Sequence, residues 1–275
     1  MIPEIYVEQW RKKAPWSSMA MIEQDLVLSR ALVNLYQQTK ISNSLAFRGG
    51  TALNKLFLTP AARYSEDIDF VQLRSEPIGE IIDAIRSALD PWLGEPKRKL
   101  TERSAKLIYR YESLDGLLAK LKIEINTTEH FQVEPLQVIP FEVSSEWFTG
   151  SALINTYQLN ELMGTKLRAL YQRRKGRDLF DLWLMLERKL IDPEKVVSIF
   201  NHYGQHNGES ITRAMFEESL HFKKQNTDFQ FDIIPLLSEP DSWSFSKAIE
   251  TIETHLIPKL EGGPWLGLVK KDHGK

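Results

Sequence analysis

Two carboxylates one residue apart are the side chains in this sequence that most clearly could do chemistry. Asp67 and Asp69 flank Ile68 in a stretch with the pattern of a β-strand. Side chains alternate between the two faces of a strand, so both carboxylates point one way while Ile68 points into the core. Two carboxylates on one face suit Mg²⁺ or Mn²⁺, because such cations bind oxygen ligands and leave room for substrate phosphates. Exposed strand faces are also often acidic, so on the pair alone an ordinary solvated surface remains an alternative interpretation.

A glycine turn precedes this pair in the sequence. Gly49 and Gly50 follow a strand-like segment that ends at Phe47, and a helical pattern begins at Thr51. Glycines allow a sharp turn and bring bare backbone close to a ligand, and Thr51 is a good N-cap. The free N–H groups and positive dipole end of a helix N-terminus favour a phosphate. We therefore expect Gly49, Gly50 and Thr51 to bind nucleotide phosphates, with Ser65 helping to orient them.

Residues 47–56, FRGGTALNKL, and 63–70, RYSEDIDF, carry a resemblance to known proteins. The sequence resembles the nucleotidyltransferase superfamily, whose signature is Gly-Ser or Gly-Gly, a short helix, and Asp-x-Asp on a strand. It resembles more closely the AbiEii/AbiGii toxin family, the toxin halves of type IV toxin–antitoxin and phage-abortive-infection systems. Thr51 stands where the superfamily prefers Ser, and fifteen residues separate it from Asp67. This long spacing favours the toxin branch over the antibiotic-modifying branch.

The resemblance implies an α/β (α+β) fold with two domains. The N-terminal domain would be a polymerase-beta-like nucleotidyltransferase domain, with a mixed sheet flanked by helices, and a C-terminal helical bundle would follow. A β-rich pattern gives way to helical periodicity near Gly150. We therefore expect a catalytic domain over residues 1–150 and a helical domain over residues 151–275.

Glu124 is a candidate third acid. Apolar residues alternate with Lys122, Glu124 and Asn126 in the returning strand of an expected hairpin, so these three polar side chains share one face. The superfamily places a third carboxylate on a neighbouring strand, where it completes the metal site or acts as a base, and the resemblance assigns that position to Glu124. Many members have Asp there, and an ordinary solvated face is the alternative.

Six cations fall within residues 166–177 with no acid among them: Lys166, Arg168, Arg173, Arg174, Lys175 and Arg177. Such a block is found on solvated helix faces and near helix C-termini, which favour cations. However, residues 165–183, TKLRALYQRRKGRDLFDLW, also resemble the second signature of the toxin family. By this resemblance Lys166 would grip the triphosphate, and the other five cations would offer a surface to RNA.

Asp178 and Asp181 follow this basic block. They are three residues apart on an expected helix and so share a face. We expect Asp178 to be the functional acid and Asp181 to be structural, paired with a cation such as Arg177 or Lys166. The spacing leaves open which of the two points into a cleft.

Composition limits the classes of protein that fit. The 275 residues carry a net charge of −2, so any contact with nucleic acid must come from a local patch. There is no cysteine, which excludes disulfides and cysteine-based zinc sites. No stretch approaches the ~20 apolar residues of a membrane-spanning helix, and the first residues lack the apolar region of a signal peptide. We expect a cytoplasmic protein without a membrane partner.

The resemblance implies transfer of a nucleoside monophosphate from an NTP to an RNA acceptor, the 3′ end of tRNA. This modification would block translation until a cognate antitoxin restrains the enzyme. Two alternatives remain open on the residues alone. The acceptor could be a protein side chain or a small hydroxyl compound, or the protein could bind nucleotide or RNA without catalysis. A close acidic pair argues against the last, because it carries an electrostatic cost that a site used only for binding need not bear.

Overall fold

The structure is a computed structural model that describes residues 2–267. The chain divides into two compact units. Unit 1 comprises Met1–Gln158 and Pro235–Pro240, and unit 2 comprises Leu159–Ile234 and Asp241–Lys275. Residues 268–275 of the expected helical domain lie outside the described part of the chain. Each unit is described by itself below.

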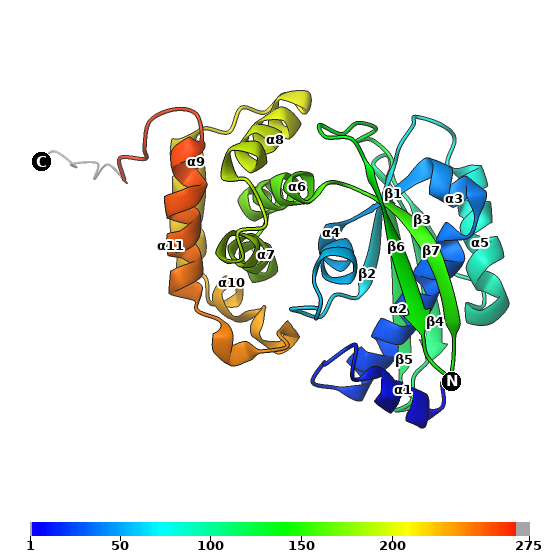
Figure 1. The fold of residues 1–275 in the computed structure, drawn as a ribbon. Helices are drawn as coiled ribbons and strands as arrows, with labels where there is room; N and C mark the ends of the chain where they lie inside the picture. Colours follow the sequence, from blue (N-terminus) through cyan, green and yellow to red (C-terminus); the bar gives the residue numbers. More distant parts are fainter. Residues whose placement is uncertain (1, 268–275) are drawn as a thin grey trace, which may run out of the picture. The chain divides into compact units, whose positions relative to one another are not determined.

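Unit 1 is built on one seven-stranded mixed sheet with the order β3-β4-β5-β2-β1-β7-β6 (Figure 1). The strands are β1 (Leu45–Arg48), β2 (Asp67–Gln72), β3 (Lys97–Leu100), β4 (Ser104–Glu112), β5 (Leu118–Asn126), β6 (Gln137–Ser144) and β7 (Thr149–Thr156). The β2–β5 and β1–β7 pairs are parallel, and the other pairs are antiparallel. The expected mixed sheet is confirmed.

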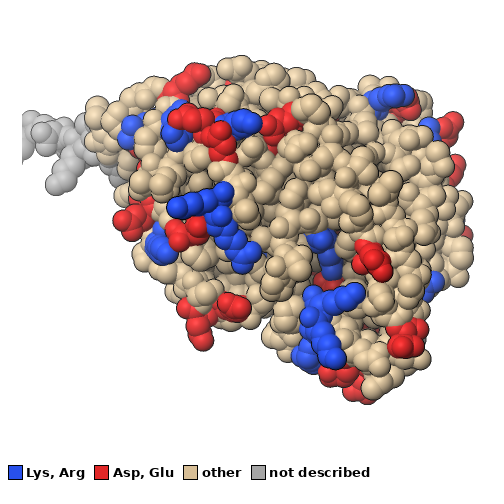
Figure 2. Space-filling model, viewed as in Figure 1, with Lys and Arg blue, Asp and Glu red and all other residues tan. Residues whose placement is uncertain are grey.

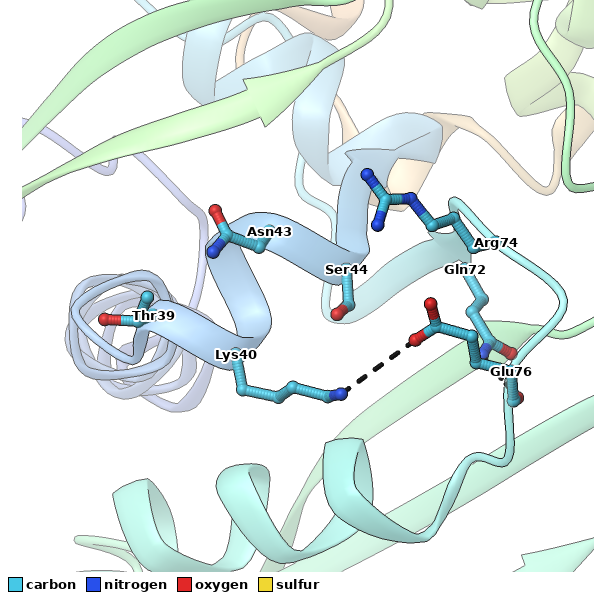
Figure 3. A pocket seen from close by; sticks show the side chains of 7 residues that line it. All are labelled: Thr39, Lys40, Asn43, Ser44, Gln72, Arg74 and Glu76. Atoms are coloured by element: carbon cyan, nitrogen blue, oxygen red, sulfur yellow. Dashed lines mark hydrogen bonds and ion pairs between the residues drawn. The ribbon is translucent and has the colours of Figure 1, made fainter.

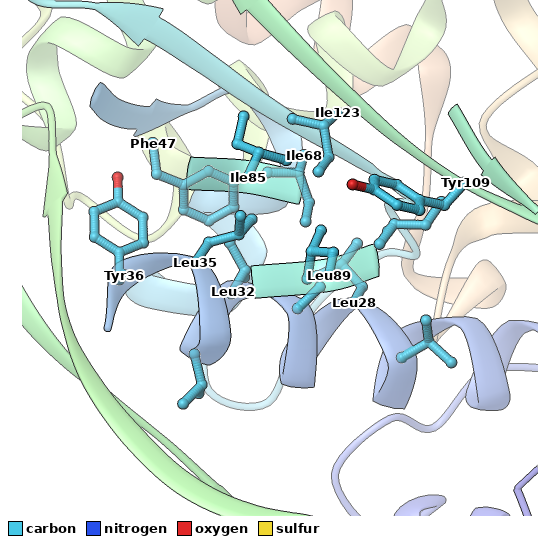
Figure 4. Close-up of a cluster of buried hydrophobic side chains, with 14 of the residues drawn as sticks. Leu28, Leu32, Leu35, Tyr36, Phe47, Ile68, Ile85, Leu89, Tyr109 and Ile123 are labelled. Carbon is cyan, nitrogen blue, oxygen red and sulfur yellow. The ribbon is translucent and has the colours of Figure 1, made fainter. Parts of the chain in front are cut away.

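Helices cover one face of this sheet. Unit 1 contains α1 (Glu4–Trp10), α2 (Met19–Tyr36), α3 (Thr39–Ser44), α4 (Gly49–Ala52), a π-helical turn η1 (Leu53–Phe57) and α5 (Gly79–Leu93). Figure 4 shows the core in which α2 and α5 meet the strands. It is formed by Leu28, Leu32 and Leu35 of α2, Ile85 and Leu89 of α5, and Phe47, Ile68, Tyr109 and Ile123 of the sheet.

The other face of the sheet is polar in the half formed by β3, β4, β5 and β2. Along β5 the buried residues Leu121, Ile123 and Ile125 alternate with partly exposed ones, as expected for a strand with one buried face. On β2, Ile68 and Phe70 enter the core. Asp67 and Asp69 therefore lie on the polar face.

Unit 2 is helical, as the sequence predicts for the C-terminal part. Its helices are α6 (Leu159–Gln172), α7 (Gly176–Glu187), α8 (Pro193–His206), α9 (Arg213–Lys224), α10 (Thr227–Phe231) and α11 (Phe245–His255), with a 3₁₀ turn η4 (Ile257–Lys259). Helix α6 packs on α7 and α8, and α11 packs on α7.

The division between the units differs from the expected boundary near Gly150. Strand β7 continues to Thr156 and pairs with β6 along its whole length, from Ser144 opposite Thr149 to Gln137 opposite Thr156. A cut at Gly150 would leave these backbone groups unpaired, so the division falls after Gln158. The short segment Pro235–Pro240 also belongs to unit 1, where the Tyr64 amide donates to the Leu236 carbonyl at 2.7 Å.

Candidate active site

The acidic pair lies on a sheet face shared with three other charged residues. In the parallel β2–β5 pair, Asp67 is opposite Lys122 and Asp69 is opposite Glu124. In the antiparallel β1–β2 pair, Arg48 is opposite Asp69. Because paired residues on adjacent strands project to the same side, the structure brings Asp67, Asp69 and Glu124 to one face, as the sequence predicts.

Two lysines contact the carboxylates of this face. Lys122 Nζ lies 2.8 Å from Asp67 Oδ2 and 3.6 Å from Glu124 Oε2. Lys106 Nζ lies 2.7 Å from Glu124 Oε1. These side chains are about one-third exposed, so water and ligands can reach them. Both Glu124 oxygens thus have a lysine neighbour, and a metal-binding or basic role for Glu124 stays a prediction.

The surroundings of Asp69 disfavour its ionised form. Burial raises the pKa of Asp69, and the negative charge of Asp67 raises it further. Arg48 and Lys122 oppose this shift without cancelling it. A raised pKa means that the surroundings disfavour the ionised carboxylate, and a cation bound beside it would reduce that free-energy cost. Shifts of this kind are common at functional sites.

The glycine turn comes close to this acid. Gly49 has φ +84°, and a Cβ there would lie 2.6 Å from Asp69 Oδ2. A side chain at position 49 would therefore be strained and would collide with the carboxylate. Gly50 is required for another reason, because a Cβ there would lie 2.2 Å from Nη2 of the buried Arg63. The turn thus places the Gly49 backbone beside Asp69.

Thr51 joins the turn to the acidic strand. Its hydroxyl donates to the Asp67 carbonyl at 2.5 Å and accepts from the Ser65 hydroxyl at 2.8 Å. The structure therefore brings Thr51, Ser65 and Asp67 together. The prediction that Thr51 caps the helix is wrong: helix α4 begins at Gly49 after the extended Arg48. Thr51 lies within this helix, and its hydroxyl bonds to the Asp67 carbonyl instead of capping the helix N-terminus.

A buried polar network holds the segment after the turn in place. On η1, Lys55 Nζ lies 2.6 Å from Asp25 Oδ1 and donates to the Ser29 hydroxyl at 3.0 Å. The indole N–H groups of Trp10 and Trp16 also donate to the Asp25 carboxylate. Since a buried charge is stable only when it is paired and hydrogen-bonded, this network ties the turn to α2.

The acidic pair fits a divalent cation. Mg²⁺ is usually held by one or two protein carboxylates together with substrate phosphates, and Asp67 and Asp69 provide two on one face. Burial and the neighbouring Asp67 charge raise the pKa of Asp69, and a cation bound beside it would favour its ionised form. Within residues 2–267, no group of three or more His, Cys, Asp or Glu side chains is arranged to hold a metal ion.

The expected site residues of unit 2 form a separate, buried cluster. Lys166 Nζ lies 3.0 Å from Asp178 Oδ1 and 2.9 Å from Asp181 Oδ2. Lys166 is 6% exposed, and the two aspartates are 0% and 1% exposed. Arg173 donates to both Asp178 oxygens, at 2.7 and 2.9 Å. Both acids therefore face Lys166. The sequence predicts that Asp181 pairs with a cation, and that cation is Lys166.

In this cluster, nearby cations compensate the negative charge of Asp178 strongly. Burial alone would raise the pKa of Asp178, but the charges and hydrogen bonds of Lys166 and Arg173 outweigh it and hold the pKa far below its ordinary value. Two cations and two acids balance in charge. Lys166 and both aspartates are buried, whereas Arg173 reaches Asp178 from the exposed surface. The predicted roles of Lys166 in gripping phosphate and of Asp178 in function are not tested by this geometry.

The remaining cations of the basic block differ in exposure. Arg173, Arg174 and Lys175 are exposed, and Arg168 and Arg177 are partly exposed. Lys175 Nζ lies 4.0 Å from Asp232 Oδ2. Figure 2 shows acidic and basic side chains interspersed on the face it draws, in agreement with the net charge of −2.

Sequence reasoning missed three residues of the site. Lys122 could have been found, since it lies two residues before Glu124 and so shares its face. Arg48 was named only as part of the glycine motif, but its Nη1 donates to Glu129 Oε2 at 2.9 Å beside Asp69. Nothing in the sequence marks Arg63 as an almost completely buried arginine against Gly50.

A polar cavity of about 550 Å³ lies elsewhere in unit 1. It is lined by Thr39, Lys40, Asn43, Ser44, Gln72, Arg74 and Glu76 (Figure 3). Gln72 is the last residue of β2, whereas Asp67 is the first. Five residues of strand span about 17 Å, so this cavity is not the acidic site.

Several solved structures share the fold of this chain. Solved structures with the same fold include the nucleotidyltransferase toxin MenT4 from Mycobacterium tuberculosis H37Rv, with a TM-score of 0.66 and 17% identity over 95% of this chain and 91% of that chain. JHP933 from Helicobacter pylori gives a TM-score of 0.51 and 19% identity, over 86% of this chain and 90% of that one. A putative nucleotidyltransferase from H. pylori has the same score, identity and share of this chain, and 92% of its own chain is covered.

The family model for the nucleotidyl transferase AbiEii toxin of the type IV toxin–antitoxin system matches residues 30–251. The chain therefore belongs to the AbiEii family, as its resemblance indicates. A search of curated protein sequences gives no significant match. Among residues 2–267, no helix combines the length and the apolar character needed to cross a membrane.

Proposed function

We propose that this protein transfers a nucleoside monophosphate from an NTP to an RNA acceptor, the 3′ end of tRNA, and thereby blocks translation. The observation that carries the proposal is the placement of Asp67 and Asp69 on one sheet face beside Gly49, in a chain of the AbiEii family. The raised pKa of Asp69 adds support, because burial and the charge of Asp67 disfavour its ionised form, which a bound cation would favour.

Asp67 and Asp69 would hold Mg²⁺ or Mn²⁺, with Glu124 as a further carboxylate on the same face. When bound, the cation offsets negative charge on the phosphates. The backbone at Gly49 and Gly50, with the Thr51 and Ser65 hydroxyls, is proposed to orient the triphosphate.

Lys166 is also proposed to contact the phosphates. Because its charge is shared between two buried carboxylates, this role requires Lys166 to exchange part of that contact for phosphate. Asp178 would then act by holding Lys166. The exposed cations of the basic block, together with Arg168 and Arg177, are proposed to contact the RNA.

In the reaction, the acceptor hydroxyl oxygen attacks the α-phosphorus of the NTP. The bond from the α-phosphorus to the bridging oxygen breaks, and pyrophosphate leaves with that oxygen. The hydroxyl proton passes to a carboxylate, for which Glu124 is the proposed acceptor. A cognate antitoxin would restrain this activity in the cytoplasm, and abortive infection of phage-attacked cells is the setting in which it would serve.

The test is a labelling assay with the purified full chain. Each α-labelled NTP is incubated with Mg²⁺ and total tRNA, beside an Asp67→Ala variant and a reaction containing EDTA. Label in tRNA only with the intact protein and Mg²⁺ is the expected result. A toxic protein that leaves tRNA unlabelled under all conditions would contradict the RNA acceptor and direct the search to protein or small hydroxyl acceptors.

A further inference from the structure

A row of cations crosses the polar face of the sheet next to the acidic pair. Six Lys and Arg side chains lie on this face, at alternating positions of three strands: Lys97 and Lys99 on β3, Lys106 and Arg110 on β4, and Lys120 and Lys122 on β5. Two acids, Glu112 and Glu124, share the face on these strands. We call these six cations the sheet-face cations. Their excess over the acids makes this part of unit 1 positively charged.

Strand register connects the sheet-face cations to the acidic pair. One line across the sheet runs from Asp67 to Lys122, then Ile108, then Lys97. The next line runs from Asp69 to Glu124, then Lys106, then Lys99. Adjacent strands lie about 4.8 Å apart, so β3 lies about 14 Å from the acidic strand. Both lines begin at a candidate catalytic carboxylate and end at a lysine on the sheet edge.

The sheet-face cations fall into two groups by their contacts. Lys106 and Lys122 are partly buried and contact the acids of the site. Lys97, Lys99, Arg110 and Lys120 are exposed, and in the described part of the chain they take part in none of the ion pairs given by the structure. These four charges are therefore available to a ligand, and β3 stays at the sheet edge with its face open.

We propose that the sheet-face cations bind the phosphate backbone of the acceptor RNA, which extends from its reacting end at Asp67 and Asp69 across β5 and β4 to β3. This proposal rests on the proposed function. Cations that track a nucleic-acid backbone give affinity without reading the base sequence. A triphosphate held at the glycine turn would lie beside Asp67. The lysines of β3 are three strands away, so a longer polyanion such as RNA is needed to reach them.

The test measures binding of fluorescent bulk tRNA to the full chain without NTP, over a range of salt concentrations. The variant replaces the four available cations: Lys97→Ala, Lys99→Ala, Arg110→Ala and Lys120→Ala. The matched control removes four exposed cations elsewhere, Lys12→Ala, Lys13→Ala, Arg98→Ala and Arg188→Ala, of which Arg98 lies on β3 but on its other face. Thermal unfolding of both proteins establishes that they fold.

We expect the sheet-face variant to bind tRNA about 10-fold or more weakly near 0.1 M salt, and to lose up to about 3 from the slope of log affinity against log salt, since each lost phosphate contact removes about 0.7. The control should change less on both measures. A sheet-face variant with the affinity and slope of the control would overturn the proposal.

Transfer kinetics separate this proposal from the proposed function. A raised KM for tRNA, with an unchanged KM for NTP, supports the surface. If the variant transfers nucleotide with an unchanged KM for tRNA, the proposed function stands and RNA binding by the sheet-face cations is ruled out. Loss of tRNA binding in the variant of a protein that labels no RNA would keep the surface and overturn the function.

Discussion

The acidic pair of unit 1 and the Lys166 cluster of unit 2 both place two carboxylates close together, but the pKa of one carboxylate shifts in opposite directions in the two. In unit 1, Asp67 and Asp69 lie on a partly exposed sheet face, and the pKa of Asp69 is raised by burial and by its acidic neighbour. In unit 2, Asp178 and Asp181 are fully buried around Lys166. There the pKa of Asp178 is held far below its ordinary value.

The two clusters differ in how their negative charges are compensated. In unit 2, Lys166 and Arg173 pair with the buried carboxylates, so a phosphate that binds Lys166 has to compete with these contacts. In unit 1, burial and the charge of Asp67 disfavour the ionised form of Asp69, and a bound cation would oppose both effects. The raised pKa of Asp69 favours a ligand site in unit 1. The functional roles of Lys166 and Asp178 stay predictions.

The largest effect expected is on activity, from Asp67→Ala. Removing a carboxylate of the acidic pair should lower the rate of nucleotide transfer at least about 10³-fold, as loss of a central catalytic group does. The midpoint of thermal unfolding should change little, because Asp67 is partly exposed. The neighbouring exposed acid provides the control, and Glu66→Ala should retain near-normal transfer. Equal losses in both variants would contradict the assignment.

The next effect is on stability, from Lys166→Met. This change leaves two buried carboxylates without their shared cation, and it should lower the free energy of unfolding by about 3–5 kcal/mol. Urea unfolding would measure it beside Lys175→Met, an exposed cation of the same block. Should Lys166→Met keep full stability and lose only transfer, the cluster would be functional rather than structural.

The two clusters should also respond to pH with opposite signs. The pKa of Asp178 is lowered on folding, so its stabilisation is present above about pH 4, the unfolded value, and is lost as pH falls further. The pKa of Asp69 is raised, so its ionisation destabilises the fold as pH rises above about 4.

Thermal unfolding in EDTA between pH 3 and pH 7 would measure this contrast. Asp178→Asn should lower the unfolding midpoint most at pH 7, and Asp69→Asn should raise it at pH 7 and leave it unchanged at pH 3. Changes of the same sign in both variants at pH 7 would remove the distinction between the clusters.

The smallest effect is expected at the exposed edge of unit 2. Arg174 is exposed, and Arg174→Ala should change the free energy of unfolding by less than about 0.5 kcal/mol. If the basic block contacts RNA, this change should lower the salt slope of tRNA binding by about 0.7. Arg173→Ala should be more destabilising, because Arg173 donates to both Asp178 oxygens. An unchanged slope in both variants would leave the sheet-face cations as the RNA surface.

Local periodicity accounts for what could be predicted. The two-residue period of a strand was enough to place Asp67 and Asp69 on one face, and to place Glu124 on the polar face of its own strand. The three-residue spacing of Asp178 and Asp181 on a helix was enough to place them together. These predictions needed only the geometry of one element, which a short stretch of sequence contains.

Long-range packing decided the rest. The register of β5 against β2 made Lys122 a partner of Asp67, and the fold placed Arg63 against Gly50. It also made Lys166 the partner of both aspartates. Unit 1 extends to Gln158 rather than to the predicted Gly150, because β7 pairs with β6 in the sheet.

Spacing along the chain was enough to predict the chemical groups and the face that each occupies on its own helix or strand. Which charges pair with one another depends on long-range packing, because pairing requires short distances between segments far apart in the chain. In this protein, packing gives Asp178 and Asp181 the buried Lys166 as a shared partner, and it leaves Asp69 with a raised pKa beside Asp67.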